Sequence, residues 1–151
     1  MPRPLRGIFR KRRKLLTLLF REAIACLRDW FRLRLALPEG ELAAVAGVRS
    51  FGDYLVFHPH LHVLAAAGLV DPAGRFHEMP VESVKPLEEL FRHRFLAALR
   101  REKLISEKKV RQLLSWKHSG FNLDAGKEPI DSTTFTAGNV WPSTSCAPRS
   151  L

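Results

Sequence analysis

The sequence FHPHLHVL, residues 57–64, carries three histidines at alternate positions within an apolar run. Alternate side chains of a β-strand point to the same face of a sheet, so a strand here brings His58, His60 and His62 together. Pro59 has no amide proton to give to a sheet, and we predict that the regular strand begins after it. His60 and His62 are therefore expected to be the closer pair.

Imidazole side chains on one face of a strand suit a divalent cation. A cation held by few protein ligands keeps coordination positions for water or a phosphate oxygen, as catalytic metal sites do. The spacing predicts a metal site with His60 and His62 as ligands and His58 as a weaker candidate. The alternative is that these histidines only pack or form hydrogen bonds within the sheet.

The segments around this strand predict an α+β fold, with an antiparallel sheet and helices largely on one face. Residues 42–79 are rich in Val, Leu and Phe and are interrupted by glycines, which is typical of strands. The sequence DPAG at 71–74 has turn chemistry, and it predicts a hairpin of residues 61–70 with residues 75–79.

Helical periodicity flanks the predicted sheet on both sides. A basic amphipathic helix is predicted over residues 10–36, where apolar residues recur at helical spacing. Pro86 and Ser106 are typical of helix starts, so two further helices are predicted within residues 86–116. The first of these helices is expected to have an exposed face that carries Arg92, His93 and Arg94.

Positive charge is concentrated in the first part of the chain. The net charge is +10, and residues 1–34 hold eleven Lys or Arg against Glu22 and Asp29. Such a segment attracts a polyanion, because each neutralised phosphate releases condensed counterions, so nucleic acid is the first partner to expect. An anionic membrane surface and a solvated helix face are the alternatives. The residues assigned to phosphate binding are Arg10, Lys11, Arg12, Arg13 and Lys14.

Other classes of protein are disfavoured by what the sequence lacks. No apolar run approaches the roughly 20 residues of a membrane span, and the first residues do not resemble a signal peptide, so we expect no membrane partner and a cytoplasmic protein. Cys26 and Cys146 have no CxxC spacing, which argues against a disulfide framework and a zinc ribbon.

Five segments, taken in order, resemble a known family of transposases. HLH at 60–62 matches the His-hydrophobe-His motif of the HUH endonucleases, and FGDYLVFHPHLHVL, GRFHEMP, KPLEELFRHR and LLSWKHSGFN resemble the catalytic domain of two-tyrosine, rolling-circle insertion-sequence transposases. The opening PRPLRGIFRKRRKLLTLL resembles the segment that enters this domain. Residues 1–130 are thus similar to part of an HUH transposase domain.

The resemblance implies a function and a site. Enzymes of this family bind single-stranded DNA at the end of the element, and a tyrosine attacks the scissile phosphate to leave a phosphotyrosine. Mg²⁺ or Mn²⁺, held by the histidine pair and a third polar ligand, positions that phosphate. The resemblance implies a protein associated with the nucleoid in a prokaryotic cytoplasm. Whether the protein forms a homodimer is left open. Further DNA contacts are implied for Trp116, Lys117, His118 and Ser119.

Two features depart from the family pattern. The family's tyrosines lie after the WKHSGFN segment, whereas the one tyrosine of this chain, Tyr54, precedes the histidines. We interpret Tyr54 as a packing residue, with catalysis as the less favoured alternative, so the nucleophile is expected to be missing. Arg49 stands about where a third ligand is expected, and an arginine cannot ligate a cation. Substitutes for that ligand are His58, Asp53 and His77.

Both ends of the chain differ from the family pattern. Relatives carry a cysteine-rich region before the PRPLR segment, and this chain has no such cysteines. Residues 131–151 show neither helical nor strand periodicity of apolar residues, and they are rich in Ser, Thr, Pro and Gly. This composition predicts a disordered tail. Because the DNA for residues 138–151 can encode a tyrosine-bearing peptide in another frame, we hypothesise that this tail is a frameshifted translation. The sequence therefore predicts a domain truncated at both ends.

The function expected from the sequence is that of a DNA-binding transposase fragment from a rolling-circle insertion sequence. Its family catalyses metal-dependent cleavage of single-stranded DNA and strand transfer. The alternative is a catalytically inactive DNA-binding remnant. An unrelated zinc-dependent histidine hydrolase is a third candidate, but the helix-rich pattern around one hairpin argues against a barrel enzyme.

Overall fold

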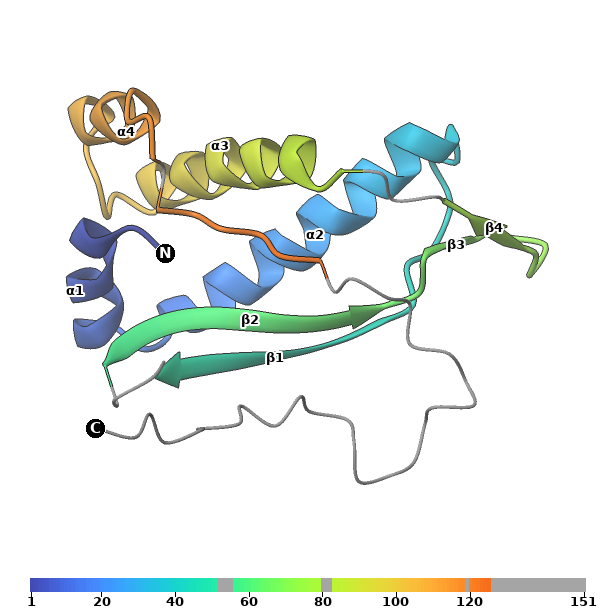
Figure 1. Ribbon diagram of the computed structural model, residues 1–151, viewed down its shortest axis with the longest axis horizontal. Helices are drawn as coiled ribbons and strands as arrows, with labels where there is room; N and C mark the ends of the chain where they lie inside the picture. Colours follow the sequence, from blue (N-terminus) through green and yellow to red (C-terminus); the bar gives the residue numbers. More distant parts are fainter. Residues whose placement is uncertain (52–55, 80–82, 119, 126–151) are drawn as a thin grey trace, which may run out of the picture.

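The computed structural model describes residues 1–51, 56–79, 83–118 and 120–125. Figure 1 shows an α+β arrangement of helices and antiparallel strands, which confirms the predicted fold class. Its helices are α1 (Arg3–Lys11), α2 (Leu15–Leu35), α3 (Lys85–Arg101) and α4 (Glu107–Leu114). Its strands are β1 (Ala44–Phe51), β2 (Phe57–Ala65), β3 (Gly68–Val70) and β4 (Phe76–Glu78). The predicted tail lies outside the described residues, as do Asp53, Tyr54 and Ser119.

The strands form two small antiparallel sheets, so the sheet predicted over residues 42–79 is divided. β1 pairs with β2, and β3 pairs with β4 around the turn at 71–74. The histidine strand is antiparallel to its neighbour as predicted, but its partner is β1. The hairpin predicted between residues 61–70 and 75–79 is limited to the short pairing of β3 with β4.

The histidine strand was predicted to become regular after Pro59, and its regular pairing with β1 does begin at His60, although the strand itself starts earlier. β2 starts at Phe57, and Pro59 lies within it with a fully buried side chain. A proline is tolerated at a strand edge because the missing amide proton is not needed there. The register shifts between Arg49 and Phe51, whose partners are His60 and Phe57, so Pro59 lies at an irregularity of the ladder, where prolines are tolerated.

The chain bends where a single helix over residues 10–36 was predicted. α1 ends at Lys11, Arg12 takes an extended backbone with φ −129° and ψ 76°, and α2 begins at Leu15. α1 has its own buried side chains, Leu5 and Phe9, both fully inaccessible to solvent. Burial of an apolar side chain of this size contributes about 1.5–3 kcal/mol, which favours docking of α1 as a separate helix.

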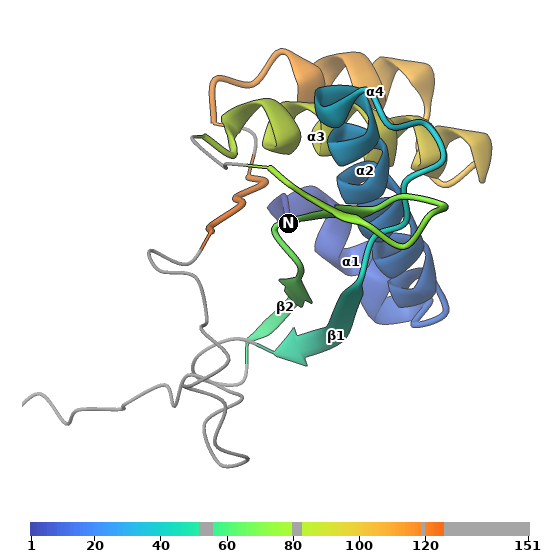
Figure 2. The same ribbon diagram turned by 90° about the vertical axis from the view of Figure 1, so that its right-hand side faces the viewer.

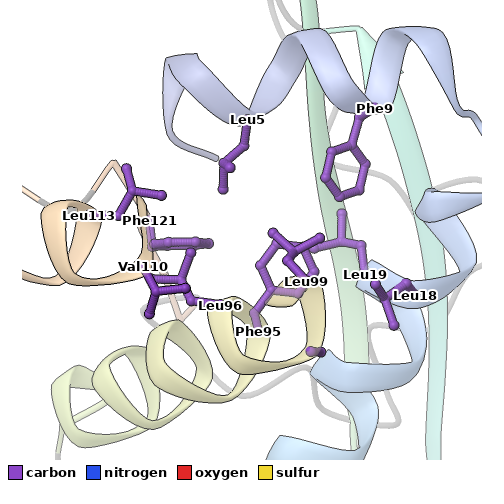
Figure 3. Close-up of a cluster of buried hydrophobic side chains, with 11 residues drawn as sticks. Leu5, Phe9, Leu18, Leu19, Phe95, Leu96, Leu99, Val110, Leu113 and Phe121 are labelled. Atoms are coloured by element: carbon purple, nitrogen blue, oxygen red, sulfur yellow. The ribbon is translucent and has the colours of Figure 1, made fainter. Parts of the chain in front are cut away.

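The main core joins all four helices. Figure 3 shows Leu5 and Phe9 of α1 directed toward Phe95 and Leu99 of α3. The rings of Phe9 and Phe95 have their centroids 6.0 Å apart, within the range of favourable aromatic contact. Leu61 of β2 packs against the edge of this cluster. Figure 2 shows the four helices on one side of the β1–β2 pair.

Two of the three α3 residues expected on an exposed face are buried or half-buried. Arg92 is 7% exposed, and Arg94 is half-buried in ion pairs with Glu22 and Asp29 of α2. Only His93 of the three predicted surface residues is exposed. Glu22 is itself buried, and a buried carboxylate requires such partners. The basic residues of α3 therefore contribute to packing rather than to a free surface.

Candidate functional site

The three histidines of β2 lie side by side along one face of the strand. The ring centroids of His60 and His62 are 5.0 Å apart, and those of His58 and His60 are 5.8 Å apart. All three side chains are half-buried. Strand alternation puts them on the face opposite Pro59 and Leu61. The structure thus brings together the residues that the sequence spacing selected.

A backbone hydrogen bond fixes the ring of His60. Its Nδ1 atom lies 2.7 Å from the carbonyl oxygen of His58. A carbonyl oxygen only accepts, so Nδ1 carries a proton, and in the neutral ring Nε2 keeps its lone pair. Metal-binding histidines commonly use this arrangement, in which a carbonyl orients the ring and sets the tautomer. His60 is therefore prepared to ligate or accept through Nε2.

The surroundings of the outer two histidines favour their neutral form. Burial, and then the positive charges of the amino terminus and Arg6, lower the pKa of His58 below its usual value of 6.5. Burial, and then the neighbouring His60 and Arg49, lower the pKa of His62. A neutral imidazole is the form that binds a metal ion. The Nε2 atom of His62 is buried, so in this arrangement a cation from solvent does not reach it.

The register of the sheet brings an arginine to the histidines. Arg49 of β1 is the direct partner of His60, and Gly47 is the partner of His62. Directly opposed residues of an antiparallel pair share a face, with Cβ atoms about 4.5–5.5 Å apart. Arg49 is exposed. The sequence singled out Arg49 only as a missing metal ligand, because its place beside His60 depends on the strand register.

The predicted phosphate-binding residues lie beside the same end of the sheet. Arg10, Lys11, Arg12, Arg13 and Lys14 are exposed, at the end of α1 and in the bend before α2. The guanidinium of Arg13 donates to the hydroxyl oxygen of Ser50 at 3.4 Å. Figure 1 shows α1 beside the start of β2 and the end of β1. The sequence did not predict this contact, because it depends on how α1 docks.

Comparison with protein families assigns the region that contains this site. Residues 44–128 match the family described as "Putative transposase", which is more than half of the chain. The chain belongs to this transposase family. The matched region begins with β1, so α1 and α2 of the transposase lie outside it. The resemblance described in the sequence analysis began at the first residues of the chain. Neither the curated proteins nor the solved structures gave a significant match.

Among the described residues, no third metal ligand accompanies the histidines of this transposase. Across the part of the chain that the structure describes, no three His, Cys, Asp or Glu residues are grouped suitably for a metal ion. His77, one expected substitute, lies on β4 and bonds through Nε2 to the carboxylate of Asp71 at 2.9 Å. Asp53, another, lies outside the described residues. The fit to a divalent cation therefore rests mainly on His60, because Nε2 of His62 is buried and Nε2 of His58 lies 3.4 Å from the amino-terminal nitrogen of Met1.

The WKHSG segment of the transposase follows α4 and divides between core and surface. Trp116 is half-buried and packs against the main core, whereas Lys117 and His118 are exposed. Gly120 has a positive φ of 69°, which glycine adopts without strain, and an added Cβ there would lie 3.0 Å from the Cα of Pro2. Of the residues expected to contact DNA, Trp116 contributes to packing, whereas Lys117 and His118 are accessible to a ligand.

A cavity of about 350 Å³ lies on the other side of β2. Its walls include Pro59, Leu61 and Val63 of the strand, together with side chains of α2 and α3; His60 borders it as well. The lining is mainly apolar. The transposase therefore presents two different faces of β2, one apolar and directed toward the helices, and one that carries the histidines and Arg49. None of the helices that the structure describes is long and apolar enough to cross a membrane.

Proposed function

We propose that this chain binds single-stranded DNA at the end of an insertion sequence, as part of a rolling-circle transposase of the HUH type. The observation that carries the proposal is the pairing of His60 and His62 on a strand of a transposase-family domain, 5.0 Å apart at their ring centroids. The proposed partner is DNA, and the proposed site of action is the nucleoid in a prokaryotic cytoplasm.

The distribution of charge supports DNA as the ligand. Five exposed basic residues lie at the end of α1 and in the following bend, and Arg13 connects them to β1 through Ser50. Exposed cations bind a nucleic-acid backbone largely through release of counterions, which is independent of base sequence. In the proposal this segment holds the backbone while the histidine face receives one phosphate.

The histidines provide part of a site for Mg²⁺ or Mn²⁺. In the proposal His60 ligates through Nε2, while His62 and His58 are further candidates. A divalent ion bound there would polarise the phosphate and neutralise its charge. The chain itself contributes orientation, because the carbonyl oxygen of His58 holds the His60 ring at 2.7 Å.

The chemistry of cleavage separates two versions of the proposal. In the first, Tyr54 attacks the phosphate and forms a covalent bond to DNA. In the second, the chain is a DNA-binding remnant without cleavage activity. The second is favoured by the presence of one tyrosine in the chain, which precedes the histidines rather than following them.

Binding is tested by fluorescence anisotropy with labelled single-stranded DNA at several salt concentrations. A variant with Lys11→Gln, Arg12→Gln and Lys14→Gln should bind more weakly and reduce the salt dependence, by about 0.7 in logarithmic slope for each lost phosphate contact. A matched control removes three exposed charges elsewhere, with Arg34→Gln, Lys108→Gln and Arg111→Gln. Equal binding by both variants, or no binding by the wild-type chain, would contradict the proposal.

Cleavage is tested separately by incubating the chain with labelled single-stranded DNA and Mn²⁺ and running denaturing gels. A covalent adduct that Tyr54→Phe abolishes would support the cleaving transposase. Binding without an adduct would support the remnant. Sequencing of the gene across the codons for residues 131–151 tests the frameshift hypothesis directly.

A further inference from the structure

We infer that the exposed face of α4 is a second DNA-binding surface, which enters the major groove of a duplex. This surface goes beyond the proposed function, in which a single strand lies on the histidine face and on the basic segment at residues 10–14. The exposed face of α4, which we call the α4 stripe, consists of Lys108, Arg111, Gln112 and Ser115.

The α4 stripe follows from the spacing of its residues. Positions that are three, four and seven residues apart lie on the same side of an α-helix, so the four side chains form one row. All four are exposed, whereas Val110 and Leu113 on the other side of α4 are buried in the main core (Figure 3). The helix therefore presents an uninterrupted polar row to solvent.

The charge of the α4 stripe is positive. The one acidic residue of α4, Glu107, forms an ion pair of 2.7 Å with Arg100 of α3. Among the described residues, no carboxylate pairs with Lys108 or Arg111, and both of these side chains are exposed. Free cations in a row attract a polyanion, because each phosphate that they neutralise releases condensed counterions. The charge therefore favours a nucleic acid as the partner.

The position and length of the α4 stripe suit a duplex. Figures 1 and 2 show α4 on the opposite side of the helices from the β1–β2 pair, so it can contact DNA without involving the histidine face. The major groove of B-DNA is about 12 Å wide and accommodates an α-helix. A row from residue 108 to residue 115 is about 10 Å long, which corresponds to about three base pairs. A single strand has no such groove.

The side chains of the α4 stripe also suit the edges of bases in that groove. An arginine can form two hydrogen bonds to guanine, and a glutamine can form two to adenine. Neither Arg111 nor Gln112 lies on the buried side of α4, so both can reach base edges. Lys108 would then contact the phosphate backbone, which positions the helix.

Both ends of α4 are held in place, so the stripe is presented by a rigid element. The hydroxyl oxygen of Ser106 accepts a hydrogen bond of 3.2 Å from the backbone amide of Lys109, which caps the start of the helix. Arg92 of α3 donates to carbonyl groups at the other end. Residues 102–106 form a short connection between α3 and α4. Helix-turn-helix proteins likewise present the second helix of a connected pair to the major groove.

The first experiment compares a labelled DNA duplex of mixed sequence with a labelled oligothymidylate, by fluorescence anisotropy with the full chain. Lys108→Gln combined with Arg111→Gln should weaken binding to the duplex about tenfold and reduce the logarithmic salt slope by about 1.8, or about 0.9 for each phosphate contact. The affinity for the oligothymidylate should change by less than about twofold. The matched control, Arg34→Gln combined with Lys85→Gln, removes two exposed charges at the end of α2 and the start of α3.

The second experiment identifies the groove. It uses the variant with Lys11→Gln, Arg12→Gln and Lys14→Gln, in which the other basic segment is weakened. This variant should still bind the duplex, and methyl green, which occupies the major groove, should displace it. Netropsin, which occupies the minor groove, should not displace it. Circular dichroism verifies that each variant is folded.

The outcomes separate the inference from the proposed function. Wild-type affinity for the duplex in the Lys108→Gln, Arg111→Gln variant would overturn the inference and leave single-strand binding standing. An equal loss for the duplex and the oligothymidylate would also overturn it, because α4 would then be a general contact for polyanions. Displacement by netropsin instead of methyl green would exclude the major groove. If the wild-type chain bound the duplex but not the oligothymidylate, only the proposed function would fail.

Discussion

The guanidinium of Arg92 on α3 donates a hydrogen bond of 2.8 Å to the backbone carbonyl oxygen of Leu113 near the end of α4. The same nitrogen donates to the carbonyl oxygens of Leu114 at 2.7 Å and Trp116 at 3.2 Å. The last carbonyl groups of a helix have no partner within the helix. Arg92 therefore holds the end of α4, and the segment that follows, against α3.

Replacement of Arg92 by methionine should destabilise the protein by about 3 kcal/mol. The change leaves buried carbonyl oxygens without their charged donor, and such losses are among the larger effects of single substitutions. Urea unfolding followed by circular dichroism measures it. His93→Ala is the matched control, because His93 is adjacent and exposed, and its effect should stay within about 0.5 kcal/mol. Similar effects of both substitutions would contradict this role of Arg92.

Two glycines should respond in opposite directions to replacement by alanine. Gly7 lies in α1 with nothing within 4 Å of an added Cβ, so Gly7→Ala should stabilise the protein by about 0.5–1 kcal/mol. A Cβ on Gly68 would lie 2.1 Å from the carbonyl oxygen of His77, so Gly68→Ala should destabilise by about 3 kcal/mol. Thermal unfolding of both variants tests the pair. A neutral Gly68→Ala would show that β3 and β4 are not packed as described.

Stability should depend on the ionisation of Asp71 in acid. The hydrogen bond from His77 and the backbone amide of Arg75 hold the pKa of Asp71 well below its usual value of 3.8. Because the folded-state pKa is lowered, this contribution is complete above about pH 5 and is lost as the pH falls through the lower value. The Asp71→Asn variant keeps an oxygen acceptor for the turn but has no carboxylate to protonate. Below about pH 4 it should therefore lose less stability than the wild-type protein.

The measurement is urea unfolding of wild-type and Asp71→Asn proteins between neutral pH and the lowest pH at which they stay folded. Glu39→Gln provides a matched control, because Glu39 is an exposed carboxylate. If the acid dependence of Asp71→Asn is the same as that of wild type, the contribution of Asp71 is disproved.

Cys26 should be unreactive in the native state. Its side chain is 1% exposed, and burial raises the pKa of its thiol to about 11. Relative to an ordinary thiol with a pKa of 9.0, the thiolate fraction at pH 8 falls about 100-fold. Iodoacetamide should therefore modify Cys26 rapidly in urea and very slowly without it, as measured by mass spectrometry in a Cys146→Ser background. Rapid native labelling would contradict the burial of Cys26.

Local periodicity made most of the elements predictable. The alternation of histidines within an apolar run predicted the strand and its shared face, since side-chain direction in a strand is set by the backbone. The spacing of apolar residues within residues 10–36 predicted α2. The bend at 12–14 was not predictable in this way, because α1 separates from α2 only through the burial of Leu5 and Phe9.

The surroundings of individual charges were less predictable. Arginine is usually exposed, so the sequence favoured a surface position for Arg92. Its burial results from carbonyl groups of α4, which lie more than 20 residues further along the chain. The pairing of β1 with β2 likewise depends on how the helices cover the strands. The sequence alone suggested residues 75–79 as the partner of the histidine strand.

The sequence by itself determined the fold class, the strand of histidines, the basic first segment and the resemblance to transposases, because each follows from the order of neighbouring residues. Only the tertiary structure decided that Arg49 lies opposite His60, that α1 brings its basic end to the same sheet, and that α3 buries Arg92. These features join residues distant in the chain. Their contacts are set by strand register and helix docking, which depend on packing of the whole domain.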